Sequence, residues 1–232
     1  MAARTGRTAA RDARIGAWAA AVASLGDLLL LYVGNAPRPE LALPAVGRAW
    51  PIWLWLGGGL GVVAIPLYAL GYRAAARLVA EAAPRSARLL SGAGAAVAVL
   101  GALIHGLTTV LLRDGLAAGA PASDPLLAVA DSGLLLPAAW SLATLLVCGA
   151  SAVFAWHVGR GGTTARRALG LANPALLTAV LAVAGLPWLL ARAFLTPAAP
   201  NLAHLLFFAA CARTLRSLAA ASPPQGSCLR QP

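Results

Sequence analysis

Apolar residues are grouped along this chain into long runs instead of alternating with polar ones. A run of about 20 apolar residues crosses a hydrocarbon core of roughly 30 Å, because a helix rises 1.5 Å per residue. Six such runs cover residues 15–33, 50–72, 89–112, 137–158, 169–190 and 198–218. A membrane β-barrel needs strict alternation, which the chain lacks, so helices are the spanning element that satisfies its own backbone. The pattern predicts an all-α polytopic membrane protein with six transmembrane helices.

The composition supports this assignment. Of 232 residues, 60% are hydrophobic and 11% charged, and the mean hydropathy is +0.78, which is more apolar surface than one soluble domain can bury. We place a single membrane domain at 15–218, between a basic cytoplasmic tail at 1–14 and a second cytoplasmic tail at 219–232. Both tails are expected to be flexible.

The basic residues predict the orientation. All 18 are arginines, and fourteen of them fall on one side of the predicted helices, namely Arg4, Arg7, Arg11, Arg14, Arg73, Arg77, Arg85, Arg88, Arg160, Arg166, Arg167, Arg213, Arg216 and Arg230. The other side has four, Arg38, Arg48, Arg113 and Arg192. The positive-inside rule places the richer side, with both termini, in the cytoplasm of a cell inner (plasma) membrane.

The net charge of +11 also raises the question of nucleic-acid binding. The arginines punctuate apolar spans and are not interleaved with aromatic residues, so contact with anionic lipid headgroups explains them better. A cleaved signal peptide over 1–34 is the competing account of the first run. It is disfavoured by Asp27 inside the run, by the length of the run and by the lack of an Ala-x-Ala site.

Proline and glycine modify two of the predicted helices. Asp124 and Pro125 suit the start of a helix, and Pro137 is expected to kink that helix or to separate an interfacial helix from the span. The second run contains Gly57 and Gly61, a pair of small residues four apart that permits close helix approach. We expect this pair to pack within one copy of the chain, although the oligomeric state is left open.

Four ionisable side chains lie within or beside the predicted spans at a similar depth. Asp27, His105 and His204 fall between the bilayer centre and the outer interface, and Asp131 precedes the fourth span on the outer side. An ionisable group at the centre of a span costs roughly 2.5–3.5 kcal/mol on insertion scales, so each needs a partner or a cavity. We expect the first three to share a pocket with Asp131 near its mouth. A purely structural, hydrogen-bonding role is the alternative.

Helical periodicity indicates which faces carry these groups. Small and polar residues share the face of Asp27 (Gly16, Ala20, Ala23, Ser24) and that of His105 (Gly94, Ala98, Gly101, Ala102, Thr108, Thr109). Such faces pack against other helices and not against lipid. The neighbouring residues predicted to bind substrate are Tyr32, Thr108, Thr109, Asn201 and Trp188. Asn173 is expected to make an interhelical hydrogen bond beside Pro174.

A bound metal or haem is a further alternative for the histidines. His105 and His204 could be axial haem ligands or could form a metal site with Asp27, but their spacing matches no known motif. Cys148, Cys211 and Cys228 are scattered and lack zinc spacing. No metal and no cofactor is therefore predicted.

Two segments carry a family resemblance: Gly-Asp-Leu-Leu-Leu-Leu-Tyr at residues 26–32 and Asn-Leu-Ala-His-Leu-Leu-Phe-Phe at residues 201–208. Together they resemble an uncharacterised family of bacterial multi-pass membrane proteins of similar length, which implies a fold but no activity. In size, membrane acids and tryptophans the chain is also similar, without a matched motif, to small membrane-bound terpene cyclases. That likeness implies an isoprenoid substrate.

Two classes of function fit the polar residues. The first is an intramembrane enzyme in which Asp27 and the histidines perform acid–base catalysis on a lipophilic small molecule, with Trp18, Trp140 and Trp188 stabilising a cation if they reach the pocket. Interface anchoring or core packing is the simpler role for the tryptophans. The second class is a proton-coupled carrier, which the absence of inverted repeats disfavours. A structural or accessory membrane subunit is a third.

Overall fold

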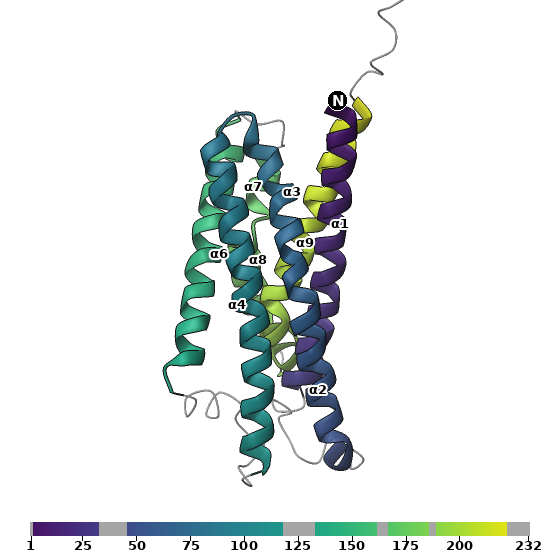
Figure 1. Ribbon diagram of the computed structural model, residues 1–232, viewed down its shortest axis with the longest axis vertical. Helices are drawn as coiled ribbons and strands as arrows, with labels where there is room; N and C mark the ends of the chain where they lie inside the picture. The colour runs from purple at the N-terminus through teal and green to yellow at the C-terminus, as the bar shows by residue number, and fades with distance from the viewer. Residues whose placement is uncertain (1, 33–45, 118–132, 162–166, 186–188, 222–232) are drawn as a thin grey trace, which may run out of the picture.

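The computed structural model describes residues 2–32, 46–117, 133–161, 167–185 and 189–221, and these residues contain helices and no strand. The helices form an upright bundle (Figure 1). In chain order they are α1 (Ala2–Asp27), η1 (Leu28–Tyr32), α2 (Val46–Ala64), η3 (Ile65–Leu67), α3 (Tyr68–Ala80), α4 (Pro84–Ala117), α6 (Leu135–Gly159), α7 (Arg167–Leu171), α8 (Pro174–Gly185) and α9 (Leu189–Ala221). The all-α membrane fold predicted from the sequence is confirmed.

Five helices of the described part are long and apolar enough to cross a membrane. They cover Gly6–Leu30, Ile52–Ala80, Pro84–Asp114, Leu135–Gly159 and Ala198–Ala221. In the bundle, α1 packs along α9, and α4 packs against α2, α3 and α6 (Figure 1). Each of these helices overlaps one of the runs predicted from the sequence.

The predicted span at 169–190 differs from expectation. It is divided into α7 and the shorter apolar helix α8, of 12 residues. Asn173 makes the break, because its Oδ1 accepts a hydrogen bond from the backbone N–H of Leu176 (3.0 Å) and its Nδ2 donates to the Gly170 carbonyl (2.9 Å). With Pro174 next to it, Asn173 is the N-cap of α8, so its role is structural, but both hydrogen bonds are to residues three positions away and not between packed helices as expected.

A proline in each of two further spans has a different effect. Pro66 lies in η3, a single 3₁₀ turn between α2 and α3, because proline has no N–H to continue the α-helical ladder. The chain nevertheless stays helical from Ile52 to Ala80. Pro137 lies in the first turn of α6, where no partner for its missing N–H is needed. The helix predicted to begin at Pro125 lies outside the described residues.

The N-terminal segment is not the flexible tail that the sequence predicts. Residues 2–14 belong to α1, and Ala9, Ala10 and Ala13 are buried. Asp12 receives a hydrogen bond from Arg73 of α3 at 2.9 Å, which forms an ion pair between the two helices. The small side chains explain the close packing that orders this segment.

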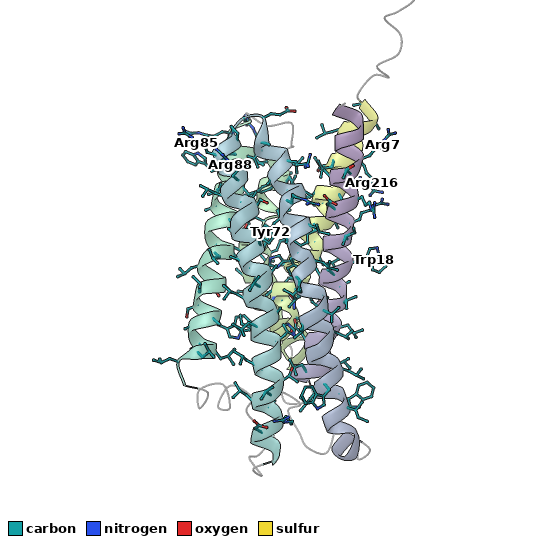
Figure 2. The ribbon with its side chains drawn as sticks, viewed as in Figure 1. Arg7, Trp18, Tyr72, Arg85, Arg88 and Arg216 are labelled. Atoms are coloured by element: carbon teal, nitrogen blue, oxygen red, sulfur yellow. The ribbon has the colours of Figure 1, made fainter. Side chains whose placement is uncertain are left out.

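Arginines from separate helices gather at one end of the bundle. Arg7 of α1, Arg216 of α9, and Arg85 and Arg88 of α4 all lie at that end (Figure 2). The arrangement agrees with a common side for these arginines, and their cytoplasmic placement stays a prediction. Trp18 points outward from α1 with 74% of its surface exposed (Figure 2), where it contacts lipid if the bundle lies in a membrane.

Candidate functional site

Asp27 is the last residue of α1, and the chain continues from it as the π-helix η1. A π-helical turn widens the helix by one residue and occurs frequently at functional sites. Asp27 is only 4% exposed although it carries an ionisable carboxyl group. Such a group requires partners within the bundle.

Two side chains from other helices provide these partners. Asn201 of α9 donates a hydrogen bond from Nδ2 to Asp27 Oδ2 at 2.7 Å. His105 of α4 places its Nε2 at 3.2 Å from Asp27 Oδ1. His105 and Asn201 are each 7% exposed. The contact between Asp27 and His105, expected from their helical faces, is therefore present, and all three groups are buried.

Tyr68 of α3 extends the polar contacts. Its hydroxyl donates a hydrogen bond to Asn201 Oδ1 at 2.6 Å. Its ring stacks on the imidazole of His204, with centroids 4.9 Å apart. We call His105, Asp27, Asn201 and Tyr68 the Asp27 network; it joins α1, α3, α4 and α9.

His204 and Tyr72 form a second polar pair beside the Asp27 network. The Nδ1 of His204 is 2.7 Å from the Pro200 carbonyl, which can only accept a hydrogen bond, so this nitrogen carries a hydrogen. In the neutral ring Nε2 is then an acceptor, and the Tyr72 hydroxyl donates to it at 2.8 Å. Tyr72 lies between the helices near the middle of the bundle (Figure 2). His204 is thus satisfied by partners of its own.

Aromatic rings surround the second pair. Phe208 lies with its ring centroid 5.6 Å from Tyr68 and 5.5 Å from Tyr72, and Phe207 is 5.1 Å from Phe154 of α6. Each of these five aromatic residues has at most 2% of its surface exposed. We call Tyr68, Tyr72, Phe154, His204, Phe207 and Phe208 the aromatic cluster. It lies on the side of Asp27 that faces the arginine-rich end, because α3 and α9 both run toward that end (Figure 1).

Glycines of α2 make room for the side chains of α4. A Cβ at Gly61 would overlap the imidazole of His105, and one at Gly58 would overlap Thr109. Gly57 packs equally closely on Gly26 of α1, so these glycines bring helices together within one chain, as expected. The His105 Nδ1 faces Gly61 and, although buried, has no hydrogen-bond partner among the described residues. Such unsatisfied atoms are uncommon.

The other predicted site residues are distributed as follows. Thr109 is buried, but its hydroxyl donates to the His105 carbonyl at 2.7 Å, and Thr108 is buried on the same helix. Asp131, Trp188 and the side chain of Tyr32 lie outside the described residues. Trp18 and Trp140 are 74% and 42% exposed, so neither belongs to the Asp27 network.

Tyr68 and Tyr72 were not predicted from the sequence to belong to the site. Both fall at the end of the second predicted span, where tyrosine is usually an interface residue. Their spacing of four residues places them on one helical face, and the helix continues beyond them to Ala80. The signal that identifies them is a pair of tyrosines four residues apart on one helical face, in a helix that continues beyond the predicted span.

Within the described part of the chain, no group of three or more His, Cys, Asp or Glu side chains is arranged to hold a metal ion. Asp27 and His105 are two adjacent groups of ligand type, and His204 is bonded to Tyr72 and Pro200 instead. The observed contacts are hydrogen bonds and one carboxylate–imidazole contact.

Comparison with known proteins adds one finding. The chain matches a family of unknown function, DUF6796, over residues 4–217. No curated protein and no solved structure matches it significantly. The match includes every residue of the Asp27 network.

Proposed function

We propose that this chain, which belongs to the DUF6796 family, is an integral membrane enzyme that performs acid–base catalysis on a lipophilic substrate with the Asp27–His105 pair. The apolar helices fit an integral membrane protein. The observation that supports the catalytic role is the contact of 3.2 Å between two buried ionisable groups from separate helices. Two buried ionisable side chains in contact are typical of sites that exchange protons.

The proposed reaction class is one that a proton-exchanging pair can carry out without a co-reactant. A lipophilic substrate with a carbon–carbon double bond or an epoxide accepts one proton from the pair and becomes a carbocation or its equivalent. Loss of a proton from a neighbouring carbon returns that proton to the pair, so the net reaction is an isomerisation or cyclisation and consumes no co-reactant. An isoprenoid has this chemistry and partitions into lipid.

The test measures product formation by the full chain in membranes. Asp27→Asn keeps the volume of the side chain but can carry neither an acidic proton nor a negative charge, so turnover of candidate isoprenoids should vanish while protein abundance persists. Asp12→Asn is the matched control, because Asp12 is a buried aspartate of the same helix outside the Asp27 network. Full activity in Asp27→Asn, or equal loss in both variants, contradicts the proposed catalytic role.

A second candidate, a proton-coupled carrier, is favoured by one observation. The polar groups are continuous from His105 through Asp27, Asn201 and Tyr68, and the Tyr68 ring stacks on His204. A series of polar groups inside a membrane span is a feature of proton relays in transporters. Purified protein in liposomes that carry a pH gradient distinguishes the two: a carrier dissipates the gradient when its solute is added, whereas an enzyme does not.

A further inference from the structure

We infer that the proton-exchanging atom of this site is the Nδ1 of His105. Asp27 is a positioning residue that accepts a hydrogen bond from His105 Nε2, and Asn201 and Tyr68 are positioning residues that keep Asp27 an acceptor. The inference rests on the proposed function and specifies which member of the pair gives up the proton. It follows from the direction of each hydrogen bond in the Asp27 network.

The hydrogen bond between Tyr68 and Asn201 sets the first direction. An amide oxygen can only accept, so the Tyr68 hydroxyl donates to Asn201 Oδ1 over 2.6 Å. The amide nitrogen, which can only donate, then faces Asp27 Oδ2 at 2.7 Å. Asp27 Oδ2 therefore accepts. If the amide turned over, Asn201 Oδ1 would face Asp27, and Asp27 would need a proton to bond to it.

The remaining oxygen of Asp27 meets His105. Asp27 Oδ1 is 3.2 Å from His105 Nε2, and a charged carboxylate is the stronger acceptor for an N–H at that position. With Nε2–H directed to Asp27, the neutral imidazole has its lone pair on Nδ1. That atom is buried, faces Gly61 and has no partner in the described part of the chain, so it is the ring nitrogen whose lone pair no hydrogen bond occupies.

In this arrangement Tyr68 affects His105 only through Asn201 and Asp27, and it does not approach the reacting atoms. Tyr68 fixes the amide of Asn201, the amide keeps Asp27 an acceptor, and Asp27 fixes the tautomer of His105. A carboxylate that orients a histidine in this way sets which nitrogen exchanges protons. His204 and Tyr72, the titratable groups next to Tyr68, have their own hydrogen bonds and do not contact Asp27 Oδ1 or Oδ2 within the described residues.

Infrared difference spectroscopy of the full chain in lipid bilayers tests the inference independently of turnover. The spectrum of the wild type minus that of Asp27→Asn should contain the bands of a carboxylate and no protonated-carboxyl C=O band at neutral pH. Tyr68→Phe releases the amide of Asn201, so a protonated-carboxyl band should appear. Tyr72→Phe removes the same hydroxyl one turn away and should leave the carboxylate unchanged.

A protonated-carboxyl band in the wild type overturns the inference, and so does an unchanged carboxylate in Tyr68→Phe. Solid-state ¹⁵N NMR of His105 provides the second measurement: Nδ1 should give the signal of a ring nitrogen without a hydrogen, and Nε2 the signal of an N–H. In turnover assays His105→Gln should lose on the order of 10²-fold or more. If the spectra agree but no lipophilic substrate is turned over, the proposed function fails while the proton assignment stands.

Discussion

The backbone of Gly61 in α2 packs directly against the imidazole of His105 in α4, leaving no space for a side chain at position 61. This relationship fixes the ring at the position where its Nε2 meets Asp27. The helix pair α2–α4 therefore determines the geometry of the site even though the described side chains of α2 add no functional group to it.

Gly61→Ala tests this dependence. The added methyl group must displace the imidazole or separate the helices, so catalytic turnover should fall sharply, with a cost of about 1–3 kcal/mol in stability from overpacking. Gly59→Ala is the matched control, because a Cβ there meets nothing within 4 Å. Thermal unfolding in detergent and turnover in membranes should both separate the two variants; identical behaviour would show that the close contact at Gly61 is unimportant.

Asn201 and Tyr68 should be energetically coupled. Asn201→Ala leaves Asp27 Oδ2 and the Tyr68 hydroxyl buried without their partner, which costs about 1–3 kcal/mol for each group left unsatisfied. Adding Tyr68→Phe removes one of these groups, so the double variant should be less destabilised than the sum of the single variants. Equilibrium unfolding of the four proteins in a mutant cycle measures this coupling, and strict additivity would argue against a shared hydrogen-bond network.

The N-cap of α8 predicts a smaller and purely structural effect. Asn173→Ala removes the acceptor for the Leu176 N–H and should cost about 0.5–2 kcal/mol. Asn173→Asp should restore most of the loss, because aspartate is also a good N-cap. Melting temperatures of the two variants provide the measurement, while turnover per folded molecule should be unchanged in both. A selective loss of turnover in Asn173→Ala would instead connect this break to the site.

The orientation can be tested by cysteine labelling. In a chain whose own cysteines are replaced, Arg77→Cys should react with a membrane-impermeant reagent only from the cytoplasm, and Ala118→Cys and Pro39→Cys only from the outside. The positive-inside rule is the reason for this expectation. Labelling of positions 77 and 118 from the same side would contradict the predicted topology.

Much of the fold could be predicted because lipid imposes simple requirements on length and hydrophobicity. The contact of Asp27 with His105 could also be anticipated, since small and polar residues share the helical faces of both. The division of the predicted span at 169–190 was not anticipated, because Asn173 and Pro174 cap a new helix within an otherwise apolar run. Local hydrogen bonding decided that segment, and hydropathy does not detect it.

The partners within the site were less predictable. Sequence periodicity tells which face of a helix a residue occupies, but not which helix lies opposite. Tyr68 lies opposite Asn201 because the 3₁₀ turn at Pro66 precedes α3 and sets the phase at which that helix begins. The position of Gly61 against His105 likewise depends on how α2 and α4 are aligned along their length, which is a property of tertiary packing.

The aromatic cluster also has a consequence for the side from which protons reach the site. Among the described helices, the buried rings of the aromatic cluster lie between Asp27 and the arginine-rich end, so on the proposed function we expect protons to reach the site from the opposite end of the bundle. With the predicted orientation, that end faces outward. A site that protons reach from one side only would equilibrate with the pH on that side, which is the behaviour expected of the proposed enzyme and not of the carrier.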